Sequence, residues 1–329
     1  MIEVRHLTKK YGSHTAVEDL SFTVEDGRIY GLLGPNGAGK TTTMNIMTGC
    51  LGATSGEVFV DGCDIFDEPA KTKKKIGYLP EMPPLYADMT PLEYLKFVAD
   101  ARGVSRAERE EQIERVMDIT QIGEMQDRLI KNLSKGYRQR VGIAQSLLGN
   151  PEVIILDEPT VGLDPKQIIE IRDLIKSLAK DHTVILSSHI LGEVQAVCDH
   201  ILIISHGKLV ASDTPENLEK RFSGASTVDL CVKGDKQRIS DVLGGLACVS
   251  EHTFREDETD GSARVCVTPK GTEDIREELF KAFSQADLPI LNMSLNKASL
   301  EDIFLEFTEE EPAKKPRGKE AKHGRNLRA

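Results

Sequence analysis

The chain has 329 residues, 39% of them apolar and 29% charged, a globular composition with room for more than one hydrophobic core. Its formal net charge of −11 argues against a protein that binds nucleic acid along its whole length. No apolar run approaches the roughly 18 residues of a membrane helix, and residues 1–12 lack the apolar core of a signal peptide, so we expect a cytoplasmic protein.

Residues 1–222 alternate between short β-like runs and helical segments, which is the pattern of an α/β domain. Strands are expected at residues 4–7, 20–24, 29–33, 58–60, 153–156, 184–186 and 201–204. Residues 91–149 are more helical, and further helices are expected at 165–179 and 191–198. In the first of these two helices, Ile168, Ile171 and Leu174 recur at helical spacing, which indicates core packing.

The character of the chain changes near residue 222, and we predict a second domain over residues 225–308. Its elements are expected at 228–232 (strand), 236–246 (helix), 248–254 and 264–268 (strands), 273–286 (helix), 290–295 (strand) and 300–307 (helix). The βαββαβ order is that of a ferredoxin-like α+β fold. Residues 309–329 are polar, contain Pro and Gly and show no periodicity, so we expect a disordered basic tail.

The sequence GPNGAGKT at residues 34–41 matches the phosphate-binding P-loop, with an expected strand before it and a helix over 41–48 after it. Its glycines allow successive backbone N–H groups to surround phosphate oxygens, and the helix N-terminus adds its dipole. Lys40 would lie against the β- and γ-phosphates of ATP, and the Thr41 hydroxyl would bind Mg²⁺. The alternative is a glycine-rich turn without a ligand. The predicted nucleotide-binding residues here are Gly34, Pro35, Asn36, Gly37, Ala38, Gly39, Lys40, Thr41 and Thr42.

A second motif, VIILDEP, places two carboxylates at the end of an apolar strand. Asp157 would hold Mg²⁺ directly or through water, and Glu158 would act as general base for the attacking water. An acidic start to a loop is common, so the pattern is weak alone. Together with the P-loop upstream, it predicts an enzyme that hydrolyses a nucleoside triphosphate.

A third motif, LSKGYRQR at residues 133–140, begins a helix for which Ser134 is the expected N-cap. By composition alone a capped helix with no further role is the simpler interpretation. Its position between the P-loop and VIILDEP, however, resembles the LSGGQ signature of the ATP-binding subunits of ABC transporters. That resemblance implies that Ser134 and Gly136 contact the γ-phosphate bound by an opposite subunit. Lys135 and Tyr137 replace the family's usual Gly and Gln.

The remaining motifs of that family also stand in the expected order along the chain, some before and some after LSKGYRQR. Tyr11 resembles the aromatic residue that stacks on adenine, although a core tyrosine is the alternative. Residues 161–164 resemble the loop that couples two active sites, and His189 resembles the switch histidine that touches the γ-phosphate. Glu81, in IGYLPE, stands where most of the family has Gln, a residue that links Mg²⁺ and the attacking water to the helical subdomain.

The resemblance implies a P-loop ATPase core, a RecA-like parallel sheet with antiparallel β and helical subdomains, that hydrolyses ATP with Mg²⁺. It also implies a second ATPase subunit, plausibly a second copy, and a separate transmembrane permease at the inner face of the membrane. IGYLPE, LSKGYRQR and the closing SLEDIFLEFT resemble the ABC-2 type, export-associated group. The substrate and the role of residues 225–308 are not specified by the sequence.

Two other functions compete with this interpretation. An ABC ATPase that acts on ribosomes or DNA is disfavoured by the single cassette, the short distance from Lys40 to Ser134 and the acidic body, so no nucleic acid is expected. A binding module with an inactive site is disfavoured because Lys40, Asp157, Glu158 and His189 are all present. Residues 312–329 carry seven Lys or Arg and one Glu, which suggests contact with anionic lipid, against the simpler alternative of a solvated tail without a role.

Overall fold

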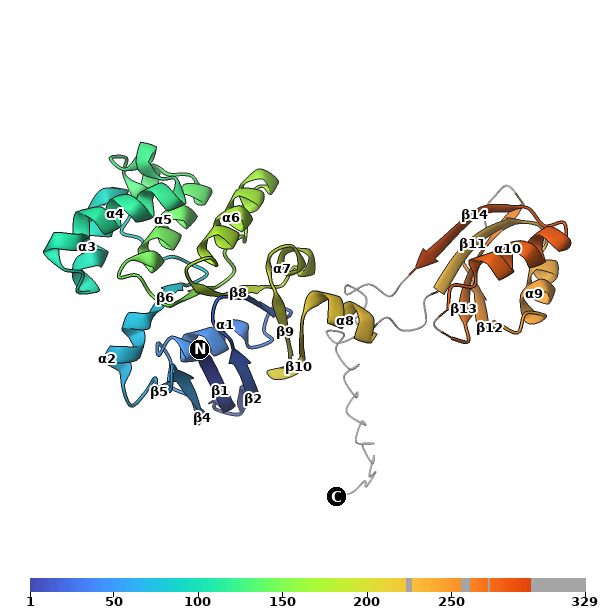
Figure 1. Cartoon of the computed structure of the whole chain (residues 1–329), viewed down its shortest axis with the longest axis horizontal. Helices are drawn as coiled ribbons and strands as arrows, with labels where there is room; N and C mark the ends of the chain where they lie inside the picture. The colour runs from blue at the N-terminus through green and yellow to red at the C-terminus, as the bar shows by residue number, and fades with distance from the viewer. Residues whose placement is uncertain (223–226, 256–260, 272, 297–329) are drawn as a thin grey trace, which may run out of the picture.

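The computed structural model describes residues 1–222, 227–255, 261–271 and 273–296 (Figure 1). Within these ranges, helices that combine the length and the apolar character needed to cross a bilayer are absent. The helix expected at residues 300–307 and the basic tail at 309–329 lie outside the described residues.

A six-stranded, mainly parallel sheet forms the centre of residues 1–222, with the strand order β10-β9-β3-β8-β7-β6. Strands β9, β3, β8, β7 and β6 run parallel, and β10 pairs antiparallel with β9 at the edge. The bounds are β3 (Ile29–Leu33), β6 (Ile76–Leu79), β7 (Val153–Leu156), β8 (Thr183–Ser188), β9 (His200–Ser205) and β10 (Lys208–Asp213). All residues of β3, β7 and β8 are buried, as expected for strands covered on both faces.

An antiparallel sheet packs on one side of the central sheet, in the order β2-β1-β4-β5. Its strands are β1 (Ile2–Tyr11), β2 (His14–Val24), β4 (Ser55–Val60) and β5 (Cys63–Asp64). Helix α1 (Lys40–Met47) shares one apolar core with this sheet and with one face of the central strands. Tyr30 and Leu32 of β3 belong to that core, whereas Ile29 and Leu33 point to the opposite core. The alternation follows the period of two of a β-strand.

Helices build the larger core with the other side of the central sheet. They are α3 (Pro91–Ala101), α4 (Arg106–Thr120), α5 (Lys135–Leu147), α6 (Pro165–Leu178) and α7 (Leu191–Val197). Of these, α5 and α7 contact strands of the sheet, and α3 and α4 pack on α5 in a group that extends away from the sheet (Figure 1). Short helices α2 (Pro69–Thr72) and α8 (Pro215–Phe222) lie elsewhere in the chain, with 3₁₀ turns at Lys73–Lys75, Gly123–Met125 and Ile130–Asn132. The stripe expected after Pro165 is largely buried, because Ile171, Leu174 and Ile175 are all in this core.

Residues 227–296 form a separate antiparallel sheet with its own core. The elements in chain order are β11 (Thr227–Lys233), α9 (Lys236–Gly244), β12 (Val249–Phe254), β13 (Ser262–Pro269), α10 (Arg276–Gln285) and β14 (Ile290–Asn296). The sheet order β12-β13-β11-β14 places the first and third strands at the centre, which is ferredoxin-like topology. The predicted fold class, an α/β core followed by a smaller α+β region, is therefore confirmed.

Several elements are longer than expected or were not predicted. Strand β1 extends from residue 2 to residue 11, whereas residues 4–7 were expected, because its pairing with both β2 and β4 continues through irregular register shifts. Strand β6 has only four residues, and β10 is a half-exposed edge strand. Both depend on a neighbouring strand rather than on a strong local pattern.

Candidate active site

The P-loop connects the central strand β3 to helix α1, as the sequence predicts. Gly37 and Gly39 adopt positive φ angles of 83° and 103°. A Cβ atom on Gly39 would lie only 2.5 Å from the carbonyl oxygen of Ala16, so this position requires glycine. The loop thus lies tightly against β2, and the N-terminus of α1 has no acidic residue in its first turn. This combination favours an anion.

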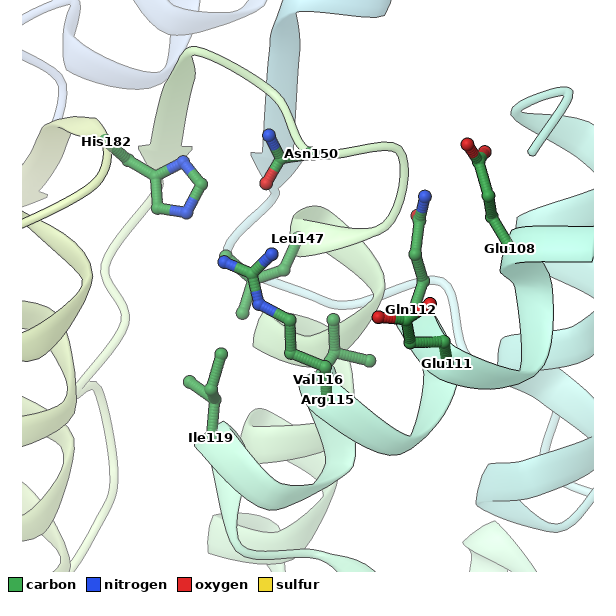
Figure 2. Close-up of a pocket in the computed structure, with 9 residues that line it drawn as sticks. All are labelled: Glu108, Glu111, Gln112, Arg115, Val116, Ile119, Leu147, Asn150 and His182. Carbon is green, nitrogen blue, oxygen red and sulfur yellow. The ribbon is translucent and has the colours of Figure 1, made fainter. Parts of the chain in front are cut away.

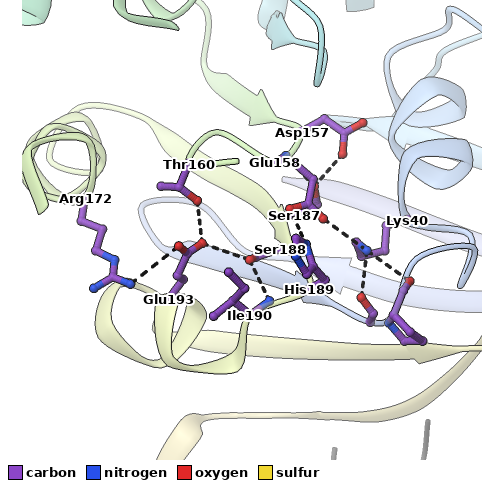
Figure 3. Close-up of polar contacts among 12 residues, drawn as sticks. Lys40, Asp157, Glu158, Thr160, Arg172, Ser187, Ser188, His189, Ile190 and Glu193 are labelled. Carbon is purple, nitrogen blue, oxygen red and sulfur yellow. Dashed lines mark hydrogen bonds and ion pairs between the residues drawn. The ribbon is translucent and has the colours of Figure 1, made fainter. Parts of the chain in front are cut away.

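Lys40 places a buried ammonium group at the start of α1, with 6% of the residue exposed. Its Nζ donates hydrogen bonds to the carbonyl oxygens of Gly34, at 2.8 Å, and Pro35, at 3.3 Å. Nζ also lies 3.3 Å from Oε1 of Glu158. The cation is therefore held between the P-loop backbone and the end of β7 (Figure 3).

Asp157 directly follows β7 and is fully buried, and its two carboxylate oxygens have different surroundings. Its Oδ1 accepts a hydrogen bond of 2.6 Å from the Ser187 hydroxyl, whereas the buried Oδ2 has no hydrogen-bond partner among the described residues. Burial raises the pKa of the Asp157 carboxyl, and the hydroxyls of Ser187 and Thr41 oppose this shift. An unpaired buried carboxylate oxygen is costly, and it fits a metal ion or a metal-bound water as its missing partner.

Glu158 lies between two other predicted site residues. Its Oε1 faces Lys40, and its Oε2 lies 3.0 Å from Nδ1 of His189. The backbone N–H of Glu158 donates to the Ser187 hydroxyl at 2.8 Å, and the residue has a positive φ of 49°. A left-handed conformation is unusual for glutamate and is found preferentially at functional sites. Ser187 thus holds both carboxylate residues, one through its hydroxyl proton and one through its oxygen (Figure 3).

A cavity of about 530 Å³ collects most of the predicted site residues. Those that line it are Tyr11, Asn36, Gly37, Gly39, Lys40, Thr41, Thr42, Glu81, Glu158 and His189. The volume is within the usual range of small-molecule sites. Tyr11, 49% exposed, offers an aromatic face at the solvent side. Gly34, Pro35, Ala38 and Asp157 are not in this lining, although Asp157 is linked to it through Ser187.

His14, Ala16 and Val161 also line the cavity. Val161 belongs to residues 161–164, which the sequence singled out, but His14 and Ala16 were not predicted. They lie on β2, which pairs with β1 and reaches the P-loop only through the packing of two sheets. The only indication in the sequence that they border the site was their position, between Tyr11 and the first core residues of β2.

Ser134 and Gly136 are not in the lining of this cavity. Ser134 caps α5 as predicted, because its hydroxyl accepts a hydrogen bond of 3.3 Å from the N–H of Tyr137. Gly136 packs against the side chain of Gln167, in the first turn of α6. The signature segment therefore lies beside α6 and does not contribute to the cavity formed by the P-loop of the same chain.

A second cavity, of about 300 Å³, lies between α4, the end of α5 and the segment before β8 (Figure 2). Arg115 and Glu111 of α4 line it, together with Asn150 and the buried His182. His182 already shares a hydrogen bond of 2.7 Å with the carbonyl oxygen of Pro151, through Nδ1. None of the predicted site residues borders this cavity, so the cavity at the P-loop is the candidate active site.

The geometry suits phosphoryl transfer to water. A glycine loop and a lysine can hold phosphate oxygens, an unpaired aspartate oxygen can hold a metal, and a glutamate beside a histidine can position water. No cluster of three or more His, Cys, Asp or Glu side chains among the described residues forms a closed metal site.

Comparisons with known proteins identify similar chains. Residues 17–161 match the ABC transporter family. The linearmycin resistance ATP-binding protein LnrL of Bacillus subtilis (strain 168) is 32% identical over 309 residues, covering 94% of this chain and 98% of that protein. The bacitracin transport ATP-binding protein BcrA of Bacillus licheniformis is 36% identical over 312 residues, covering 93% and 97%. A solved dimer of the ATP-binding cassette MJ0796 in a post-hydrolysis state, bound to ADP and Pi, has a TM-score of 0.60 and 26% identity, covering 65% of this chain and 98% of that one.

Proposed function

The chain belongs to the ATP-binding proteins of ABC transporters, and from this premise we propose that it powers export through a separate membrane permease. It is the subunit that binds and hydrolyses ATP. Export is supported by the similarity, over more than nine-tenths of the chain, to proteins named for bacitracin transport and linearmycin resistance. This coverage also favours transport over a role on ribosomes or DNA.

The observation that carries the site assignment is the convergence of the P-loop, Glu158 and His189 on one cavity. The backbone of residues 34–39 and the N-terminus of α1 bind the phosphates, with Lys40 at the β- and γ-phosphates. Tyr11 stacks on the adenine. Glu158 accepts the proton of the attacking water, and His189 contacts the γ-phosphate.

Thr41, Asp157 and Glu81 are the proposed residues for Mg²⁺. The buried Oδ2 of Asp157 without a partner supports this assignment, and Thr41 and Glu81 line the same cavity. When bound, the metal neutralises charge that develops on the phosphate oxygens. Glu81 adds a negative charge that the family's usual glutamine lacks. In this proposal it links the metal site to the helical subdomain of residues 91–147.

A second subunit completes the site in this proposal. Ser134 is exposed and lies outside the cavity of its own chain, so its hydroxyl is available to another chain, whereas Gly136 is buried beside Gln167 of α6 and would contribute through the same helix end. The dimer of MJ0796 is a precedent for the pairing. Because one chain contains every motif, a homodimer is the simplest assembly. ATP then joins two copies, and hydrolysis releases them.

We place the dimer at the inner face of the membrane, on its permease. The net charge of +6 in residues 312–329 supports an additional contact with anionic lipid, because a basic residue near such a surface is worth about 1 kcal/mol. Deletion of these residues should then weaken binding of the full chain to anionic vesicles and leave binding to neutral vesicles unchanged.

The decisive experiment is Glu158→Gln in the full chain. Turnover should fall by roughly 10²–10⁴-fold, the range for loss of a general base, and ATP should trap a dimer visible by light scattering. Glu170→Gln is the control, because it also removes one carboxylate, from an ion pair with Arg140 outside the cavity. Unchanged turnover in Glu158→Gln would refute the role of Glu158.

A mixing experiment tests the shared site. Lys40→Ala and Ser134→Arg should each be inactive alone, since every composite site then lacks one part. Mixed dimers contain one site with an intact Lys40 from one copy and an intact Ser134 from the other. Recovery of activity on mixing is the expected result, and its absence, with mixed dimers present, would refute completion by a second copy.

A further inference from the structure

Glu193 is a buried carboxylate that lines no part of the active-site cavity. It belongs to α7, whose other buried residues Leu191, Val194 and Val197 are apolar. Only 7% of Glu193 is exposed. A buried carboxylate is costly unless it is paired and hydrogen-bonded, so its partners indicate what it does.

The two hydroxyl partners of Glu193 belong to the two active-site loops, one that follows β7 and one that begins at Ser188, the last residue of β8 (Figure 3). Thr160 Oγ1 donates to Glu193 Oε2 at 2.5 Å, and Ser188 Oγ donates to the same oxygen at 3.1 Å. Thr160 is two residues beyond Glu158, and Ser188 immediately precedes His189. One carboxylate oxygen therefore ties both loops together behind the cavity.

Hydrogen bonds hold the chain on both sides of His189, at Ser188 and at Ile190. The Ser188 hydroxyl also accepts a hydrogen bond of 3.0 Å from the N–H of Ile190. The other oxygen of Glu193 faces α6, where Nη2 of Arg172 lies 3.9 Å from Oε1. The negative charge of Glu193 is thus balanced by Arg172, on the helix that follows the coupling loop at 161–164. Its Oε2 accepts hydrogen bonds from two hydroxyls.

We infer that Glu193 is a positioning residue for ATP hydrolysis, which fixes the Glu158–His189 pair by anchoring Thr160 and Ser188. The inference rests on the function proposed above for Glu158 and His189. In front of the loops, the two side chains are 3.0 Å apart, and Ser187 holds the backbone of Glu158. Behind them, Glu193 sets the spacing of the two loops. Errors of about 1 Å in such positions lower rates by roughly 10²-fold.

The sharpest variant is Thr160→Val, which removes the hydroxyl and keeps the shape. In the full chain with ATP and Mg²⁺, kcat should fall by about 10–10²-fold, while the ATP affinity and KM change by less than about threefold. Thr160→Ser should restore kcat because the hydroxyl returns. Glu193→Ala should lower kcat similarly, and the double variant should be no worse than Glu193→Ala alone, because both break one link.

Thr120→Val is the matched control. Thr120 is, like Thr160, a buried threonine, and its hydroxyl donates to the Val116 carbonyl oxygen at 2.7 Å within α4. It should lower the melting temperature about as much as Thr160→Val and leave kcat unchanged. A readout independent of turnover is the NMR signal of the His189 ring, assigned with His189→Asn. This signal should shift in Thr160→Val and Glu193→Ala and not in Thr120→Val.

Failures of the two proposals differ. If Glu158→Gln abolishes turnover but Thr160→Val keeps the parent kcat and the parent His189 signal, only the positioning role of Glu193 is wrong. If Glu158→Gln turns over normally, the proposed function of Glu158 is wrong. A loss of kcat in Thr160→Val that Thr120→Val matches at equal loss of stability would show a merely structural role and overturn the inference.

Discussion

Replacing Gly39 by alanine tests the packing of the P-loop against β2. At φ 103° and ψ 3°, an L-residue is strained by roughly 1–3 kcal/mol. The new Cβ would also lie 2.5 Å from the Ala16 carbonyl oxygen and 3.4 Å from Val17 Cγ2. Because Ala16 is within β2, the P-loop must move, which adds about 1–3 kcal/mol for overpacking. We expect Gly39→Ala to lower the free energy of unfolding by about 2–6 kcal/mol in sum.

Gly37→Ala separates strain from the clash. Gly37 has a similar φ of 83°, but a Cβ there would have no atom of the described residues within 4 Å. This variant should therefore show the strain alone, roughly 1–3 kcal/mol. Chemical denaturation without nucleotide compares the two, and calorimetry with ATP should show at least about a tenfold weaker affinity for Gly39→Ala, equivalent to about 1.4 kcal/mol. Equal destabilisation by the two variants would refute the argument from close packing.

Three further predictions concern the metal, a histidine and the C-terminal core. Glu81→Gln should weaken Mg²⁺ binding modestly and keep hydrolysis, whereas Asp157→Asn should abolish Mg²⁺-dependent turnover; a magnesium titration of both variants decides this. Burial lowers the pKa of His200, so the unfolded chain binds more protons and stability falls as pH decreases from about 6.5. His200→Gln should reduce that fall, as measured by melting between pH 7 and pH 5. Phe283→Ala, at a fully buried position, should cost about 3–5 kcal/mol and increase hydrogen exchange in residues 227–296, with ATP affinity retained.

The local structure of the segments that form the candidate site was predictable because the information for it is local. GPNGAGKT combines glycines for positive φ with a lysine at the start of a helix, and VIILDEP combines a buried strand with two terminal carboxylates. The ferredoxin-like order was also readable, since each of its elements has its own periodicity. These features depend on neighbours within a few residues, which is the range that a sequence pattern describes well.

Features that depend on distant pairing were missed. His14 reaches the cavity only because β2 packs over the P-loop, and the four residues of β6 form a strand only beside β7. Glu193 is a similar case, because a glutamate in a short helix reads as a solvated residue. Its burial follows from Thr160 and Ser188, which lie 33 and 5 residues away in the chain.

Costly features of the fold gather at the end of β7, and their clustering is itself evidence for function. Asp157 has a buried oxygen without a hydrogen-bond partner in the part of the chain that the structure describes, Glu158 has a left-handed backbone, and Lys40 is a buried cation. Each lowers the stability of the chain, and the apolar strands β3, β7 and β8 around them offset that cost. Selection for stability alone would replace these residues by apolar ones. A ligand that brought phosphate to Lys40 and a metal to Asp157 would explain their burial, because the ammonium, now paired with Glu158, would gain a second anionic partner and the free carboxylate oxygen would gain a cation.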